Sequence, residues 1–195
     1  RNGRGSSMLV IIGEDRVTLA HSGVLHIRDA DVDGNELGVD DARIWNVPNE
    51  DGIMIGVGDD LVIADLLRYD ADLARGTLSL QKIQKEVIPA IRKKLGQFGK
   101  IAEKGFTGNS IYIAQGNRCF EIDSMFTCVE VERMSGYQII EDDVVSYCEC
   151  HADMPMEERL KKAFRYSEDR LGRKMFPVLW MDTKERKIRK IEKEN

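Results

Sequence analysis

The residues best suited to metal chemistry form an acidic loop near the amino terminus. Carboxylates alternate at Asp29, Asp31 and Asp33, a glycine follows, and Asn35 and Asp40 come next. Hard oxygen ligands at alternating positions followed by glycine are typical of the opening of a calcium loop. No predicted helix flanks the loop on either side, as it would in a helix-loop-helix calcium site. The sequence therefore leaves two interpretations open, a calcium-binding loop and a solvated acidic turn.

Two other groups of residues could do chemistry. The run Cys148-Glu149-Cys150-His151 contains zinc-type ligands, but a zinc site needs a second ligand pair. Cys119 and Cys128 fall in strand-like segments, so ordinary reduced thiols are expected instead. His21 and Ser22 invite a Ser-His interpretation, yet adjacent residues of a strand point to opposite faces. We expect no catalytic pair from these two residues alone.

The composition sets broad limits on the function. The chain has 195 residues, 42% hydrophobic and 32% charged, which is typical of one globular domain. A net charge of -5 argues against nucleic acid as the main partner. No apolar run approaches the roughly 20 residues that span a bilayer, so we expect no membrane partner and a reducing cytoplasmic location. Residues 1–7 are interpreted as a flexible leader or an artificial remnant ahead of a single domain at 8–195.

The elements that must position these residues begin with a hairpin at Leu9–Gly23, in which apolar runs enclose a Gly-Glu-Asp turn. Further strands are predicted at Val24–Arg28, Ala42–Val47, Gly52–Val57, Ser110–Gln115, Arg118–Ile122, Phe126–Glu132, Phe176–Met181 and Lys184–Ile191. Helices are predicted from Val62 to Gly76, from Ser79 to Gly96, around Asp143–Cys150 and from Pro155 to Leu171. Pro89 should kink or loosen the second helix. Segregated strand and helix runs of this kind indicate an α+β fold with antiparallel sheets covered by helices.

The first stretch carries a resemblance to a known family. Ser6-Ser7-Met8-Leu9-Val10-Ile11-Ile12-Gly13 and Val17-Thr18-Leu19-Ala20-His21-Ser22 form two small hydroxyl residues, a strand, a glycine turn and a second strand. The stretch ARIWNVPNEDGIMIGVGDD and the Ser135-Gly136 turn continue the pattern. In these features the chain resembles the proteasome β-subunit and HslV peptidase family of N-terminal-nucleophile (Ntn) hydrolases. The resemblance implies a four-layer αββα sandwich, with two antiparallel sheets each covered by a helix pair.

The resemblance also implies positions for an active site. In that family the first residue attacks the scissile carbonyl, its α-amine accepts the proton, and a lysine and an aspartate support the reaction. The corresponding positions here are Ser6 for the nucleophile, Ser22 for the supporting acid, Ser135 in the Ser-Gly turn and Asp169 after the last long helix. The lysine position falls at or near Asp41. A carboxylate there would raise, rather than lower, the proton affinity of a nearby amine.

Because the acid and the lysine are both missing at these positions, the predicted function is a ring-forming structural or assembly subunit without peptidase activity. The alternative is an active Ntn peptidase whose mature chain begins at Ser6 or Ser7. A third interpretation is a calcium-stabilised binding module. The resemblance implies a homo-oligomeric ring that works with an ATPase or an assembly partner, and calcium is the one cofactor that the sequence suggests.

Overall fold

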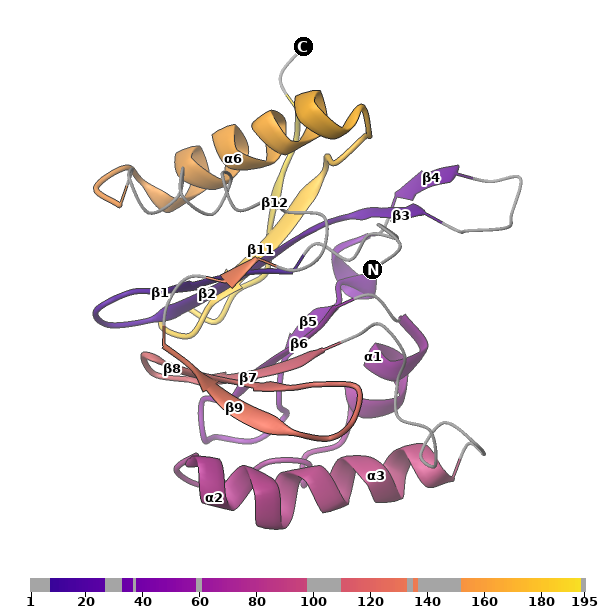
Figure 1. Ribbon diagram of the computed structural model, residues 1–195, viewed down its shortest axis with the longest axis vertical. Helices are drawn as coiled ribbons and strands as arrows, with labels where there is room; N and C mark the ends of the chain where they lie inside the picture. Colours follow the sequence, from indigo (N-terminus) through magenta and orange to yellow (C-terminus); the bar gives the residue numbers. More distant parts are fainter. Residues whose placement is uncertain are drawn as a thin grey trace.

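Two antiparallel five-stranded sheets form the centre of the molecule. The computed structural model describes residues 8–26, 33–36, 38–58, 61–97, 110–132, 135–136 and 152–193. The first sheet contains, in spatial order, β10 (Ser135–Gly136), β1 (Leu9–Ile12), β2 (Val17–Ser22), β11 (Val178–Asp182) and β12 (Arg189–Ile191). The second contains β5 (Ile44–Asn46), β6 (Met54–Val57), β7 (Ile111–Gln115), β8 (Arg118–Ile122) and β9 (Cys128–Val131). The sheets are stacked face to face (Figure 1).

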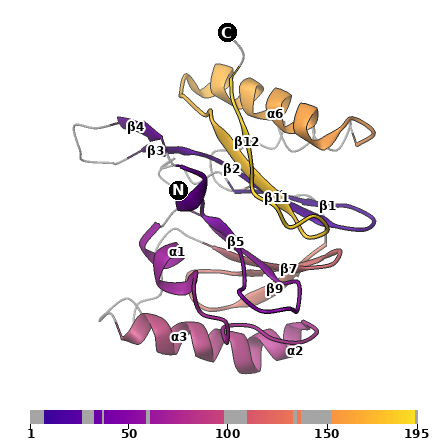
Figure 2. The same ribbon diagram turned by 180° about the vertical axis from the view of Figure 1, so that it is seen from behind.

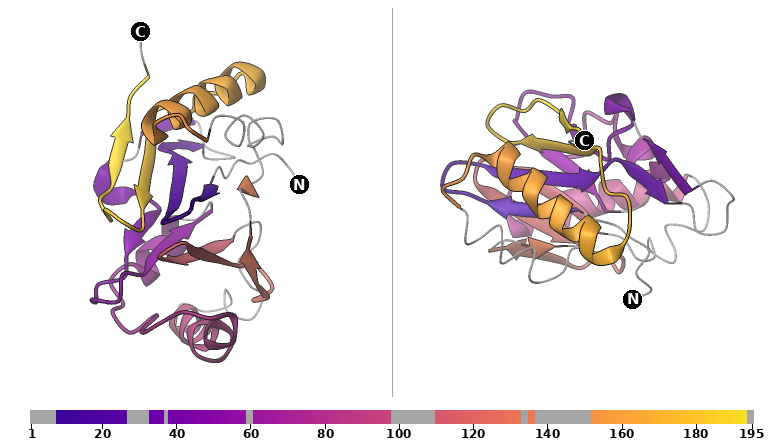
Figure 3. Two further views of the ribbon diagram at one scale, coloured as in Figure 1. Left: turned by 90° about the vertical axis from the view of Figure 1, so that its left-hand side faces the viewer. Right: turned by 90° about the horizontal axis from the view of Figure 1, so that it is seen from above.

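Helices cover the outer faces of the two sheets. The second sheet is covered by α1 (Leu61–Leu67) and by a longer helix made of α2 (Leu80–Lys82), η2 (Ile83–Val87) and α3 (Ile88–Gly96). The first sheet is covered by α6 (Met156–Leu171). The side and top views in Figure 3 show this order of layers, helix, sheet, sheet, helix. The predicted αββα sandwich is therefore confirmed.

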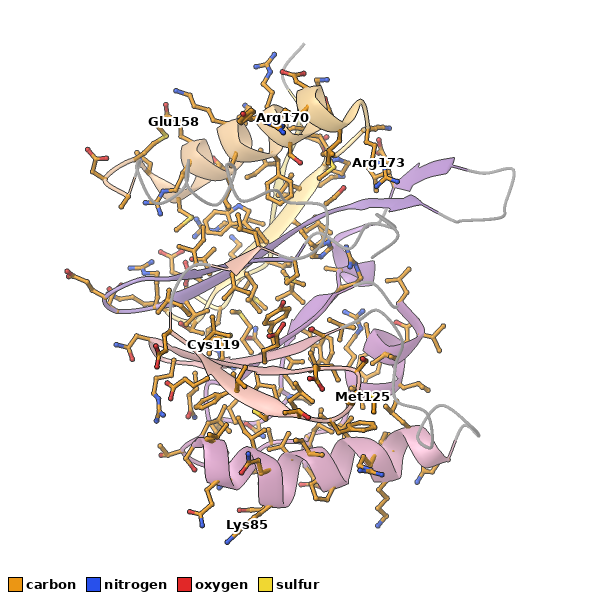
Figure 4. The ribbon with its side chains drawn as sticks, in the orientation of Figure 1. Lys85, Cys119, Met125, Glu158, Arg170 and Arg173 are labelled. Atoms are coloured by element: carbon orange, nitrogen blue, oxygen red, sulfur yellow. The ribbon has the colours of Figure 1, made fainter. Side chains whose placement is uncertain are left out.

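Strand periodicity explains why the layers hold together. Successive side chains of a strand point to opposite faces, so Leu9 and Ile11 of β1 pack with α6 while Met8 and Val10 pack against the second sheet. The layer between the sheets consists of Met8, Val10, Val17, Leu19, Ile44, Met54, Tyr112, Ala114, Cys119 and Met181. Figure 4 places Cys119 in this layer, while the charged ends of Lys85 and Glu158 lie on the outer surfaces of the helices. Both sheets thus bury both faces.

The helix over 80–96 forms as predicted, with a widened turn in its middle. The Ser79 hydroxyl accepts the Lys82 N–H at 3.1 Å and caps its start. Pro89 lacks an N–H and crowds the preceding turn, and the π-helical turn η2 directly precedes its segment. The expected loosening is confirmed.

The helix α1 is shorter than predicted. It ends at Leu67 rather than near Gly76. The Asp70 carboxylate accepts the Asp72 N–H at 2.9 Å, and the Asn49 amide donates to two carbonyls of the following turn at 2.8 and 2.9 Å. These bonds satisfy the backbone without a helix. Leu73 still enters the core, which is why its spacing resembled a helical face, whereas Tyr69 is exposed.

The carboxyl-terminal elements agree with the prediction in type and differ in extent. Pro155 directly precedes α6 rather than occupying its first turn, and Gly172 ends it at a φ of 62°. The final strand begins at Arg189 and not at Lys184. The Asp182 carboxylate accepts two backbone N–H groups of the turn that follows it, at 2.9 and 2.6 Å, and so delays the strand. The strand β12 lies at the edge of the first sheet.

The acidic segment contains more structure than a loop. Part of it forms β4 (Asp33–Glu36), which pairs with β3 (Val24–His26), and part forms the 3₁₀ turn η1 (Val39–Asp41). This strand pair projects from the end of β2 (Figure 1). The helix predicted around Asp143–Cys150 lies outside the described residues. None of the helices within the described ranges has the length and apolar character that crossing a bilayer requires.

Candidate functional site

The candidate site is the end of the sandwich where β1 begins. Leu9 pairs with β2 on one side and with Gly136 of β10 on the other. The structure therefore brings Ser22, at the end of β2, and the backbone of Ser135 to this end of the first sheet. Ser6 lies outside the described residues.

The Ser22 hydroxyl is bonded into the fold. Its side chain is buried, and Oγ donates to the Met175 carbonyl at 2.7 Å. The same oxygen accepts the Val24 N–H at 3.2 Å. A serine hydroxyl carries a single proton, and here that proton links β2 to the segment leading into β11. Ser22 thus places a neutral hydroxyl where the resemblance predicts a supporting acid.

His21 connects the two sheets. Its Nε2 accepts the Arg43 backbone N–H at 3.2 Å, and Nδ1 lies 2.7 Å from the Ser22 carbonyl oxygen. A backbone N–H can only donate, so the hydrogen of the neutral ring is on Nδ1 and is donated to Ser22. Burial lowers the pKa of His21 well below its usual value, and the charges of Arg43 and Arg68 lower the pKa further. The imidazole is therefore neutral and has a partner at each nitrogen.

Arg43 provides positive charge beside Ser22. It directly precedes β5 and is 5% exposed, with Nη2 lying 3.3 Å from the Ser22 carbonyl oxygen and 3.2 Å from His21 Nδ1. The basic residue that contacts Ser22 is Arg43, and the placement of the family's lysine position at or near Asp41 stays a prediction. A guanidinium stays protonated at every ordinary pH, so it can stabilise a negative charge but cannot act as a base. Counting back from Ile44 would have identified Arg43 in the sequence.

A carboxylate reaches this region from α6, but it is not Asp169. Asp169 is exposed on the last turn of α6, whereas its neighbour Glu168 is 7% exposed. Glu168 Oε2 accepts the Met175 N–H at 2.7 Å, and the Met175 carbonyl accepts the Ser22 hydroxyl. Burial raises the pKa of Glu168, yet hydrogen bonds from Lys193 and the Met175 amide outweigh burial and lower that pKa. The helical spacing of Leu160, Phe164 and Glu168 on one buried face was the available sequence signal.

The predicted calcium ligands do not all fall in one loop. Asp33 and Asn35 lie in β4, Asp40 is exposed in η1, and Asp29 and Asp31 lie outside the described residues. Within the described ranges, no group of three or more His, Cys, Asp or Glu residues is arranged to hold a metal. Calcium binding by the acidic segment stays a prediction.

The described cysteines are unreactive. Cys119 and Cys128 are free and buried. Burial raises the pKa of Cys119, and burial together with the nearby acids raises the pKa of Cys128 to about 11. A thiol that stays protonated is a poor nucleophile and a poor metal ligand. The Cys148-Glu149-Cys150-His151 cluster lies outside the described residues.

Solved structures match the chain over nearly its whole length, although no family model and no curated protein sequence matches it. HslV from Trypanosoma brucei aligns with a TM-score of 0.57 at 14% identity, covering 91% of this chain and 97% of that chain. Thiobacillus denitrificans BPH, in complex with epoxomicin, gives 0.67 at 13% identity with the same coverages. Anbu (ancestral β-subunit) from Yersinia bercovieri gives 0.64 at 10% identity, covering 97% and 88%. The chain has the HslV-like Ntn-hydrolase fold.

The HslV-like fold directs attention to the start of β1. Three polar side chains gather there, and the hydrogen bonds of two of them cross between elements: Ser22 joins β2 to Met175, and His21 joins β2 to Arg43. Arg43 in turn accepts the Val57 N–H at its backbone oxygen, at 2.9 Å, and so joins the second sheet. The arrangement can hold two sheets together and can stabilise a negative charge near Arg43.

Proposed function

We propose that the chain is a proteasome/HslV-like subunit that forms a homo-oligomeric ring and acts as a structural or assembly component without peptidase activity. The observation that carries this proposal is Ser22, whose hydroxyl is donated to the Met175 carbonyl and which supplies no carboxylate. An Ntn hydrolase needs charge support for the amine that accepts the proton. A neutral hydroxyl committed to the backbone does not give that support.

Exposed apolar side chains support self-association. Tyr69, just after α1, is 81% exposed, and Val62 on α1 is 58% exposed. Met125, in the turn between β8 and β9, is 76% exposed. Large apolar groups at three surface positions favour contacts with other subunits.

Native mass spectrometry at micromolar concentration tests the ring. The proposal predicts one closed species whose mass is an integer multiple of the chain's. The double variant Val62→Ser/Tyr69→Ser should shift the population toward smaller species, whereas Lys85→Ser on the outer surface of η2 should leave it unchanged. A wild-type protein that stays monomeric at this concentration contradicts the proposal.

An active Ntn peptidase with its nucleophile at Ser6 or Ser7 is the second candidate, and Arg43 favours it. A buried cation near the start of β1 would lower the pKa of an adjacent amine, as the family's lysine does. Epoxomicin, which is bound in the BPH structure, separates the two candidates. A covalent mass increase on the amino-terminal peptide, absent in Ser6→Ala, supports the peptidase, and an unchanged mass supports the structural subunit.

We also infer a cytoplasmic location and an ATPase or assembly partner. The free thiols of Cys119 and Cys128 support a reducing compartment. Affinity purification of the tagged chain from its own cells tests the partner: co-elution of a stoichiometric ATPase or assembly factor is expected, and recovery of the chain alone argues against it.

The third candidate, a calcium-stabilised module, rests on Asp33, Asn35 and Asp40 with the outlying Asp29 and Asp31. Calcium should raise the melting temperature relative to a chelator, and Asp31→Asn should remove the shift. Equal melting temperatures in calcium and in chelator would contradict a calcium-stabilised module.

A further inference from the structure

A pocket opens between the edges of the two sheets. Its volume is ≈ 390 Å³. Its walls come from η1, β5, the residues at the end of α1 and the β11–β12 connection, and Figure 2 shows β5 with α1 beside it and β11 and β12 above it. The residues that line the pocket include Asp40, Trp45, Asn46, Arg68, Tyr69 and Arg186.

Two nitrogen donors at this pocket lack hydrogen-bond acceptors. Arg68 Nη2 and Trp45 Nε1 are both buried without a hydrogen-bond partner. Trp45 is 6% exposed and the Arg68 side chain 10%, and the guanidinium lies over the indole with Cζ 5.6 Å from its centroid. Burying such donors without an acceptor is unfavourable, and more so for a charged group. An acceptor supplied by a ligand would remove this cost.

The carboxylate of Asp65 does not satisfy Arg68. Asp65 Oδ1 lies 3.6 Å from Nη2, beyond hydrogen-bond distance, on a side chain that is 71% exposed. An ion pair with so exposed a partner contributes little, because solvent screens it. Among the described residues, Arg68 Nη2 therefore has no carboxylate within hydrogen-bond distance.

The other charges at the pocket favour an anion. Arg186 is a second guanidinium, held in place because Nε donates to Asn46 Oδ1 at 3.2 Å and Asn46 Nδ2 donates to the Arg186 carbonyl at 2.8 Å. Among the described lining residues, Asp40 is the single acid against these two cations, and it is exposed. Apolar walls reduce solvent screening within the pocket and strengthen its charge interactions.

We propose that this pocket binds a small oxyanion of the carboxylate or phosphate class. A guanidinium can donate two parallel hydrogen bonds to a pair of anionic oxygens, and the indole N–H supplies a third donor from another direction. Both nitrogens are covered in the ligand-free chain, so binding turns the end of Arg68 toward the pocket while Tyr69, which is 81% exposed, is free to move aside. The inference is independent of peptidase activity.

Tryptophan fluorescence tests the proposal. The chain has two tryptophans, so Trp180→Phe leaves Trp45 as the reporter. Titrations with sodium phosphate and with sodium acetate, at constant ionic strength maintained by sodium chloride, should give a saturable change in emission with at least one of the two. Saturation by phosphate alone identifies a tetrahedral oxyanion, saturation by acetate alone a carboxylate, and no saturation by either overturns the proposal.

Variants of the pocket make the test specific. Arg68→Met should weaken binding at least ~10-fold, the loss of one charge-assisted hydrogen bond, and Asp40→Asn should strengthen it by removing the lining acid. Arg75→Met is the matched control, because Arg75 is exposed and pairs with Asp72 outside the pocket. If Arg68→Met does not fold, Arg68→Lys keeps the charge without the fork and should weaken binding less. Equal affinity in wild type, the Arg68 variant and the control overturns the proposal.

Discussion

The two ends of the β1–β2 hairpin join the same two sheets by different chemistry. At the start of β1, the link is the buried imidazole of His21, which accepts the Arg43 N–H. At the turn end, Thr183 Oγ1 accepts the Val17 N–H at 2.9 Å and donates to the Gly116 carbonyl at 2.5 Å. The first link depends on a titratable group and the second does not. The end of the hairpin where β1 begins is therefore the end whose stability should depend on pH.

The largest expected effect is the loss of the imidazole link. We expect His21→Ala to lower the free energy of unfolding by ~3 kcal/mol at pH 8, because it leaves the Arg43 N–H unpaired and opens a cavity. Urea denaturation measures this. Asn117→Ala, which removes an exposed bond to the Glu14 carbonyl at the turn end, should change stability by less than about 0.5 kcal/mol. Similar decreases in the free energy of unfolding of the two variants would contradict the difference between the two ends of the hairpin.

The next effect is the pH dependence of the His21 link. Burial and the charge of Arg43 lower the pKa of His21 in the folded chain, whereas an unfolded histidine titrates near 6.5. Below that pH the unfolded chain binds a proton that the folded chain does not, so stability is complete above pH ~6.5 and falls as the pH is lowered.

We expect wild type to lose up to about 1.4 kcal/mol per pH unit below pH ~6 relative to His21→Gln, which cannot titrate. Urea denaturation of both proteins from pH 8 to pH 5 measures the difference, and contributions of other groups cancel in the comparison. Parallel stability curves would show that His21 is not the titrating link.

A smaller loss is expected at the turn end. Thr183→Val removes the donor to the Gly116 carbonyl and the acceptor for the Val17 N–H while keeping the side-chain volume. The free energy of unfolding should fall by about 1–2 kcal/mol. The fall should be the same at pH 8 and pH 5.5, since no titratable group is lost. A loss that grows with acidity would mean that the two ends are coupled.

The smallest effect is expected from the ion pairs at the turn end. Hydrogen bonds from Arg16 and Lys184 lower the pKa of Asp15, but the carboxylate is fully exposed. Solvent and salt screen such pairs. Asp15→Asn should therefore be indistinguishable from wild type in thermal denaturation at high salt. A clear decrease in melting temperature there would show that this network supports the turn.

The fold could be predicted from the sequence because its determinants are local. The apolar runs around the glycine turn at Leu9–Gly23 indicate β1 and β2, and Ser79 with Gly172 marks a helix start and a helix end. Where a side chain distant in the sequence determines the backbone conformation, local sequence patterns do not predict that conformation. Asn49 binds the carbonyls beyond α1 from the β5–β6 turn, and no local signal announces it.

The site was predicted less completely for the same reason. Ser22 was identified, but its partner Met175 lies 153 residues away along the chain. Glu168 rather than its neighbour Asp169 faces this region, a difference of one helical position that depends on which face of α6 is buried. Arg43 was not identified because only the fold brings it to Ser22, which lies 21 residues before it in the chain. The rotation of α6 about its axis and the register of the strands determine which side chains reach this end of the first sheet.

A peptidase assay on a chain whose first residue is Ser6 tests most directly whether the protein lacks peptidase activity. That terminus is produced by cleavage of a removable tag, and the otherwise identical Ser6→Ala chain serves as the blank. We expect the same rate of fluorogenic peptide hydrolysis for both chains, because Ser22 supplies no acid and its hydroxyl is donated to the Met175 carbonyl. Hydrolysis by the Ser6 chain above the Ser6→Ala blank would show that this end of the sandwich retains its catalytic chemistry.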